Sequence, residues 1–164
     1  MAISTALERL DYGSTDGSIQ VGAHRQIISG VGATRTLLPG ESGALCLFDR
    51  AAGIVYTLPT PVEGMQFEFA TTVTITGGAA KTITGTIASQ FILGAIFGYT
   101  TDATEIDGFS ADGSTHVAIS SNGSTTGGVI GDRYTLTAIS STQWLIEGSV
   151  FCGTSTPATP FATS

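Results

Sequence analysis

Charged side chains are scarce in this chain. They make up 12% of its 164 residues, whereas soluble domains usually carry about 25%. Only six are basic, the formal net charge is −7, and the basic residues are scattered: Arg9, Arg25, Arg35, Arg50, Lys81 and Arg133. A surface that binds nucleic acid by neutralising phosphates needs clustered lysine and arginine. The sequence therefore predicts no nucleic-acid partner, and an acidic surface that keeps particles apart in solution.

Cysteine and histidine are also rare. The two cysteines, Cys46 and Cys152, and the two histidines, His24 and His116, are too far apart in sequence to indicate a zinc site. Cys46 lies in an apolar run, where a free thiol behaves as a small hydrophobic group. The pair allows one disulfide, which stays open as the alternative to two free thiols.

Long hydrophobic runs are missing. The longest, Phe91 to Phe97, is far shorter than the roughly 20 residues that span a bilayer. The first residues, Met1 to Ser4, lack the basic start and apolar core of a signal peptide. We therefore expect no membrane partner.

Patterns that carry catalysis are absent too. The chain holds no G-x-S-x-G nucleophile motif and no phosphate-binding glycine loop followed by lysine. His116 and Ser120 share one strand face, but no orienting partner completes a catalytic set. The acidic segment 102–112 lacks the closing glutamate of a calcium loop, so we interpret it as a solvated loop. The sequence predicts no enzyme, no metal and no cofactor.

Threonine and glycine are abundant, with 26 and 22 residues respectively. Threonine favours strands, whereas glycine interrupts strands and weakens helices. At this length one domain, with or without terminal arms, is expected to bury a substantial core. The composition predicts an all-β protein.

The strongest β signal runs from Gly43 to Ala70. An apolar run at 44–48 is followed by a turn that ends at Gly53, and a second run at 54–58 ends at Pro59. The third run, Met65–Phe69, alternates apolar and polar residues, as a strand with one buried face does. We predict three strands here, on which the rest of the chain packs.

Further strands are predicted on both sides of a Gly77-Gly78 turn, with 71–76 and 81–87 paired as a hairpin. Segments 133–139 and 143–150 are predicted to close the fold as a second hairpin. Segment 89–99 is predicted as a core strand, with a buried subunit contact as the alternative. About nine or ten short strands indicate an antiparallel β-sandwich or barrel. We place this domain at 35–152, an extended N-terminal arm at 1–34 and a C-terminal tail at 153–164, with a frayed N-terminus as the alternative to the arm.

The central stretch has a recognisable order: a strand ending in Phe-Asp, an Ala-Gly turn, a strand ending in Thr-Leu-Pro, then Pro-x-x-Gly and an alternating Phe strand. Later come Gly131-Asp132 with an alternating strand, and a Trp144 strand that leads to Gly148. Over roughly residues 37–150 the chain resembles the capsid decoration, or cement, proteins of tailed bacteriophages. Similar β modules also occur in phage tails and fibres.

The resemblance implies a structural virion protein that binds the exterior of the assembled capsid. It implies a homotrimer at threefold or quasi-threefold positions, with the major capsid protein as partner, made in the host cytoplasm. A reducing cytoplasm favours free thiols for both cysteines. The candidate interface residues are apolar residues of the arm and of segment 89–99: Leu7, Leu10, Ile19, Val21, Ile27, Ile28, Phe91, Ile92 and Phe97.

The alternative function is a tail or fibre module that binds a host-surface glycan. Exposed aromatic side chains would then stack on sugar rings. The candidates for that role are Tyr12, Tyr56, Tyr99, Tyr134 and Trp144, although the apolar neighbours of Trp144 favour a place in the core.

Overall fold

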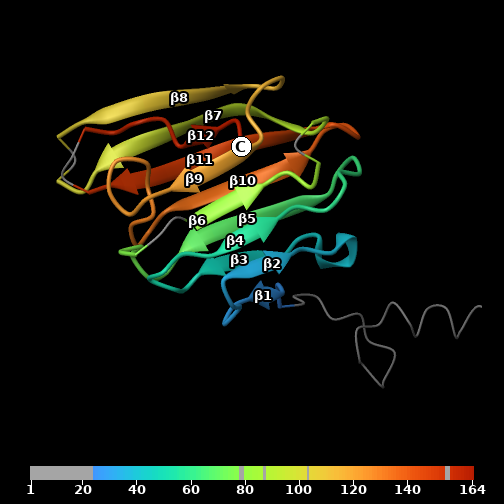
Figure 1. The fold of residues 1–164 in the computed structure, drawn as a ribbon, viewed down its shortest axis with the longest axis horizontal. Helices are drawn as coiled ribbons and strands as arrows, with labels where there is room; N and C mark the ends of the chain where they lie inside the picture. Colours follow the sequence, from blue (N-terminus) through green and yellow to red (C-terminus); the bar gives the residue numbers. More distant parts are fainter. Residues whose placement is uncertain (1–23, 78–79, 87, 103, 154–155) are drawn as a thin grey trace, which may run out of the picture.

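The fold consists of two β-sheets that lie one over the other (Figure 1). The computed structural model describes residues 24–164 except 78–79, 87, 103 and 154–155. Within these residues there are twelve strands, one 3-10 turn, η1 (Pro39–Glu41), and no α-helix. The all-β prediction is confirmed.

The larger sheet has seven strands. In spatial order they are β1 (Ile27–Ile28), β3 (Leu45–Phe48), β5 (Gln66–Thr71), β10 (Arg133–Ala138), β11 (Gln143–Cys152), β7 (Phe91–Thr100) and β8 (Ile106–Asp112). The smaller sheet has five: β12 (Phe161–Ala162), β9 (Ala118–Ser121), β6 (Ala80–Ile83), β4 (Val55–Thr57) and β2 (Thr34–Thr36). Each sheet keeps two separate edges, so among the described residues the fold is not a closed barrel.

From β1 to β6 the chain alternates between the two sheets. Each strand of one sheet is followed by a strand of the other, so successive strands of the same sheet run in the same direction. The pairs β1–β3, β3–β5, β2–β4 and β4–β6 are all parallel, and β7–β11 is parallel as well. The prediction of an antiparallel fold is therefore wrong: both sheets are mixed.

The three strands predicted between Gly43 and Ala70 are present as β3, β4 and β5. The turn at Gly53, whose φ is +79°, also exists, but it carries the chain across to the other sheet. The hairpin predicted around Gly77-Gly78 is wrong, because β5 ends at Thr71 and β6 pairs with β4 and β9. The closing hairpin is confirmed by β10 and β11, which pair antiparallel from Arg133 with Ser149 to Ala138 with Trp144.

Aromatic side chains fill the space between the sheets. Tyr56 of β4 lies with its ring centroid 5.2 Å from that of Phe48 and 5.6 Å from that of Phe69. Phe69 stacks on Tyr134 at 5.2 Å. Trp144 is fully buried beside Phe67, which confirms its predicted core position.

The terminal segments join the β domain more closely than predicted. β1 and the first residue of β2 lie within the predicted arm 1–34, and β12 lies within the predicted tail 153–164. Phe161 of β12 is buried, and this short strand pairs with β9. The β domain therefore extends beyond 35–152 at both ends. The first 23 residues of the arm lie outside the described residues.

Both cysteines are free and fully buried. Cys46 is on β3 and Cys152 on β11, with β5 and β10 between them. Three strand spacings of about 4.8 Å separate β3 from β11 by roughly 14 Å, and Cys152 lies further along β11 than the row of Cys46, so the two thiols are too far apart for a disulfide. Burial, followed by the charge of Glu41, raises the pKa of the Cys46 thiol to about 12. Both residues therefore act as core packing.

Candidate interaction surface

The outer face of the seven-stranded sheet is the candidate interaction surface, because several large hydrophobic side chains are exposed on it. Side chains alternate along each strand, so the residues between the core positions project outward. The strand register aligns one outward residue from each strand in a single row: Ile27, Leu45, Glu68, Thr135, Glu147, Ala95 and Ser110. This row is apolar at the β1 end, charged in the middle, and apolar again at β7.

The middle of the face is organised by Glu68 of β5. Its side chain is only 8% exposed, and its two oxygens accept hydrogen bonds from Arg25 and Arg133. Burial opposes ionisation of Glu68, but the two guanidinium groups outweigh burial and lower the pKa of its carboxyl. Glu68 is therefore a buried carboxylate held by two arginines.

Arg25 also attaches the segment just before β1 to the neighbouring strands. Its guanidinium donates hydrogen bonds to the carbonyl oxygens of Gly43, at 2.6 Å, and Ala44, at 3.1 Å. These bonds, with the one to Glu68, hold the segment before β1 against β3 and β5. A single charged side chain thus anchors the edge of the sheet.

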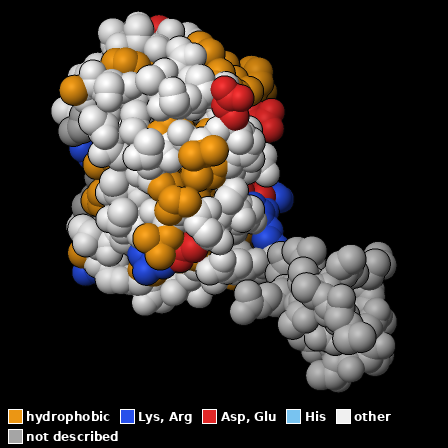
Figure 2. Space-filling model, turned by 90° about the vertical axis from the view of Figure 1, so that its right-hand side faces the viewer, with side chains coloured by type: hydrophobic (Ala, Val, Ile, Leu, Met, Phe, Trp, Pro, Cys, Tyr) orange, Lys and Arg blue, Asp and Glu red, His pale blue; other side chains and the backbone are white. Residues whose placement is uncertain are grey.

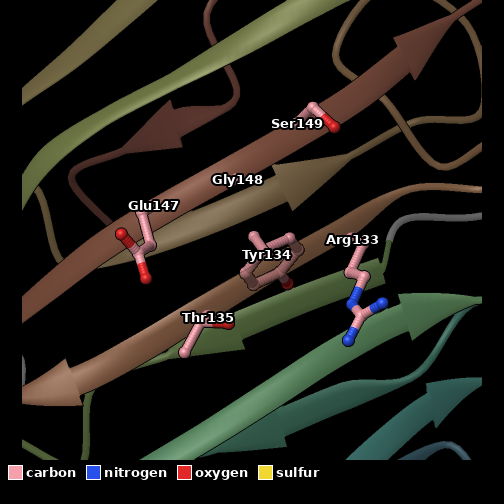
Figure 3. A pocket seen from close by; sticks show the side chains of 6 residues that line it. All are labelled: Arg133, Tyr134, Thr135, Glu147, Gly148 and Ser149. Carbon is pink, nitrogen blue, oxygen red and sulfur yellow. The ribbon is translucent and has the colours of Figure 1, made fainter.

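A shallow hollow of about 370 Å³ lies over β10 and β11 (Figure 3). Its lining residues come in register pairs, with Arg133 opposite Ser149 and Thr135 opposite Glu147. Gly148 adds no side chain here, and its φ is +145°. A Cβ on Gly148 would lie 2.4 Å from the carbonyl oxygen of Arg133, so the close approach of β10 requires glycine.

At one end of this face lies an apolar area that we call the β7 stripe. It consists of Leu93, Ala95, Phe97 and Tyr99 of β7, Leu145 of β11 and Ile106 of β8, all on the outward side by register. Phe97 is 53% exposed and Ile106 is 60% exposed. All four outward residues of β7 from 93 to 99 are apolar, so the stripe is continuous along this strand.

The other end of the face carries a smaller apolar area that we call the β1 patch. It consists of Ile27 of β1 with Leu45 and Leu47 of β3. Ile27 is 58% exposed, and the two leucines are half-buried. Figure 2 shows one end of the molecule, where apolar side chains lie near the middle and charged side chains lie mainly towards the edges of the view.

The structure divides the predicted interface residues into three groups. Ile27 and Phe97 are exposed and Phe91 is half-buried, so these side chains reach the surface. Ile28 and Ile92 are 6% and 0% exposed and belong to the core, which removes them from any surface contact. The remaining four lie outside the described residues: Leu7, Leu10, Ile19 and Val21.

Most aromatic residues considered for glycan stacking are inaccessible. Tyr56, Tyr134 and Trp144 are all buried between the sheets. Tyr99 is half-buried and lies beside Phe151, with their ring centroids 6.1 Å apart. Tyr12 lies outside the described residues. Burial therefore removes three of the five proposed stacking residues.

The Gly131-Asp132 motif has a structural role. Asp132 is 2% exposed, and its carboxylate accepts hydrogen bonds from the backbone N–H groups of Gly128, at 2.5 Å, and Phe151, at 2.6 Å. Burial raises the pKa of this carboxyl to about 7, although the N–H donors act in the opposite direction. Asp132 thus ties the loop before β10 to the end of β11.

The acidic segment 102–112 is only partly a loop, because β8 begins at Ile106. Asp112 accepts hydrogen bonds from the backbone N–H groups of Ser114 and Thr115 and from the Thr115 hydroxyl. His116 lies 3.2 Å from the same carboxylate and packs against Phe161. Within the described part of the chain, no cluster of three or more His, Cys, Asp and Glu side chains has the arrangement of a metal site.

The chain has no match among family models, curated proteins or solved structures. In the described part of the chain, no helix is of a length and hydrophobicity that would cross a membrane.

Proposed function

We propose that this protein decorates and stabilises the assembled capsid of a tailed bacteriophage. In this proposal it binds the exterior of the shell as a homotrimer, at threefold or quasi-threefold positions formed by the major capsid protein. It has no catalytic role and is made in the host cytoplasm before it joins the particle. The sequence resemblance supplies the family, and the residues that carry it lie in β3, β4, β5, β10 and β11 and in the turns beside them; β3, β5, β10 and β11 are consecutive strands of the larger sheet.

One observation carries the proposal: a two-sheet body exposes two apolar areas on the outer face of its larger sheet. Exposed apolar patches usually mark places where another protein binds. The β7 stripe and the β1 patch together give the seven-stranded sheet two such areas, both on the outward side of rigid strands. Rigid strands lose little conformational entropy on binding, which favours affinity.

The stabilising mechanism follows from selective binding. A protein that binds the assembled shell, and does not bind separated capsid subunits, shifts the equilibrium towards the shell by mass action. A trimer repeats each contact three times, and the effective concentration of the second and third contacts strengthens the attachment. No chemical step is required of any residue.

The proposal is tested by comparing particles that carry the protein with particles that lack it. Particles without it should release their contents at a lower temperature and after milder osmotic shock. Adding back the purified protein should restore resistance, while separated capsid subunits should show no binding. Equal resistance of both kinds of particle would contradict the proposal. Location at the tail, together with binding to glycans, would instead favour the glycan-binding alternative.

A further inference from the structure

Among the described residues the two sheets have four edges, and one edge differs from the others. β1, β2 and β12 form three of the edges and contain only two or three residues each. The fourth edge strand, β8, contains seven residues and pairs with β7 in one continuous register. It has no proline, lysine or bulge, the features that commonly protect an exposed edge from pairing with another chain. β8 is therefore the long, regular edge of the described fold.

The pattern of hydrogen bonds between β7 and β8 determines which backbone groups of β8 point away from β7. In an antiparallel pair, alternate residues bond to the partner strand, and the residues between them face the other way. The bonds at the two ends of this pairing both use odd-numbered residues on the β8 side, Glu105 and Gly113. The N–H and C=O groups of the even-numbered residues Ile106, Gly108 and Ser110 therefore point to the free edge, where the sheet ends.

The side chains beside this edge differ between its two faces. On the outer face Ile106 is 60% exposed and Phe97 is 53% exposed, and the Phe97 ring lies 3.8 Å from where a Cβ on Gly108 would be. On the opposite face the exposed carboxylates of Glu105 and Asp107 occupy alternate positions. Neither β7 nor β8 carries a basic residue. A strand added at this edge would therefore meet apolar groups on one face and two negative charges on the other.

This chain offers no suitable strand of its own for the edge. Pairing β8 of two copies would gather Glu105, Asp107 and Asp112 of both copies in one two-stranded ribbon that holds no basic residue, and like charges across a strand pair are destabilising. The six basic residues of the chain are each at least ten positions from the next, so no segment alternates basic and apolar residues. The charge of the edge therefore favours a strand from a different protein.

We propose that the free edge of β8 binds an extended segment of a different protein, which joins the larger sheet as an eighth strand. The backbone groups of Ile106, Gly108 and Ser110 supply the main-chain hydrogen bonds, which give affinity, while the side chains give specificity. The bound segment alternates apolar residues, on the side of Phe97, with lysine or arginine, on the side of Asp107. That this segment belongs to the major capsid protein is the one part of the inference that rests on the proposed function.

A synthetic peptide of about eight residues that alternates valine and lysine matches β8 in length and is the probe. We expect saturable binding in calorimetry, and slower hydrogen exchange at the amides of Ile106, Gly108 and Ser110. The control peptide has the same side chains and charge, but all its backbone nitrogens are methylated and donate no hydrogen bond. It should bind roughly tenfold more weakly or worse, because the main-chain hydrogen bonds are lost. Equal binding of the two peptides, or no binding of the first, would overturn the inference.

A matched pair of variants tests the edge itself. Ser110→Pro removes an N–H group that faces the free edge, and proline is tolerated at such a position of an edge strand. It should weaken peptide binding roughly tenfold or more, whereas Ser110→Ala, which keeps the N–H group, should not. Equal binding by the two variants would overturn the inference. Self-association of the wild type that Ser110→Pro abolishes would also overturn it, because a second copy would then occupy the edge.

Charge reversal tests the acidic face without changing the backbone. Asp107→Lys should weaken binding of the valine–lysine peptide and strengthen binding of a peptide that alternates valine and glutamate. Glu63→Lys makes the same change of net charge at an exposed residue of the loop between β4 and β5, and should leave both affinities nearly unchanged. Equal effects of the two variants would show that overall charge, and not the β8 edge, attracts the peptide, which would overturn the inference.

These measurements also separate the inference from the proposed function. Peptide binding is measured on purified protein, whereas shell binding is measured on particles. Wild-type protein that binds the alternating peptide at β8 but does not bind capsids would contradict capsid decoration alone. Protein that decorates capsids but binds no such peptide would contradict only the role of the β8 edge.

Discussion

The hydroxyl groups of Tyr134 and Thr82 lie 2.8 Å apart in the core and join the two sheets. Tyr134 belongs to β10 of the larger sheet, and Thr82 to β6 of the smaller one. In the opposite direction, the Tyr56 hydroxyl donates a hydrogen bond to the carbonyl oxygen of Leu47 at 2.8 Å. Each sheet therefore sends one phenol across to the other.

Tyr134→Phe should lower the free energy of unfolding by about 1–2 kcal/mol. The substitution removes one partner of a buried hydrogen bond and leaves the Thr82 hydroxyl unsatisfied. Thermal or urea unfolding measures this change. Adding Thr82→Val should recover part of the loss, because the remaining unsatisfied group is then removed. Tyr99→Phe, on the outer face, is the control and should have almost no effect.

Asp132 should make stability depend on pH. Its pKa is about 7 in the folded protein and about 3.9 when unfolded, so between these values the folded state binds more protons. The stability that Asp132 contributes is therefore full below about pH 3.9 and is lost as pH rises through about 7. Unfolding measured from pH 4 to pH 8 should show this decline.

The matching variant is Asp132→Asn, which cannot titrate. Its stability should change less steeply between pH 4 and pH 7 than that of the wild type. It should also be less stable than the wild type at pH 4, because the amide of Asn has one acceptor oxygen where the Asp132 side chain has two for Gly128 and Phe151. Identical pH slopes for the two proteins would show that Asp132 does not titrate in this range.

Glu68→Gln should lower the free energy of unfolding by about 1–2 kcal/mol at neutral pH, since both arginines lose a charged acceptor and both are partly exposed. The pKa of Glu68 is lower in the folded protein than in the unfolded chain. Its stabilising effect is therefore complete at a pH above the unfolded pKa, and it is lost as the pH falls through the folded pKa. The wild type and the variant should therefore converge in acid. Glu147→Gln, an exposed carboxylate in the same row, serves as the control.

Gly94→Ala should be strongly destabilising, by about 2 kcal/mol or more. The φ of Gly94 is +124°, and a Cβ there would lie 2.4 Å from the carbonyl oxygen of Ile146 on the neighbouring strand. Gly108→Ala on β8 is the matched control. Its Cβ would meet nothing nearer than the Phe97 ring at 3.8 Å, so denaturant unfolding should detect little change.

The sequence was sufficient to predict the existence of most strands, because their signals are local. Alternation identified Met65–Phe69, and an apolar run identified the segment that contains β7. Pairing was harder to predict, because alternation indicates which side chains are buried without indicating which sheet covers them. Gly53 illustrates this difficulty: it forms the predicted turn, yet the next strand enters the other sheet.

The outer face could be predicted only in part. Phe97 was identified as a contact residue from its apolar segment, but Ile92 in the same segment is buried, since the strand alternates. The row from Ile27 to Ala95 joins residues from six strands, and no local pattern connects them. The cluster of Arg25, Glu68 and Arg133 was missed for the same reason, because its members are distant in the sequence.

The alternation of β1 to β6 between the sheets has a consequence for folding. β3 and β5 become neighbours only after β4 has crossed to the opposite layer, and β4 and β6 depend on β5 in the same way. Neither layer can assemble ahead of the other, so this half of the molecule should be gained or lost in a single all-or-none step. Limited proteolysis should therefore release no stable fragment that consists of one sheet alone.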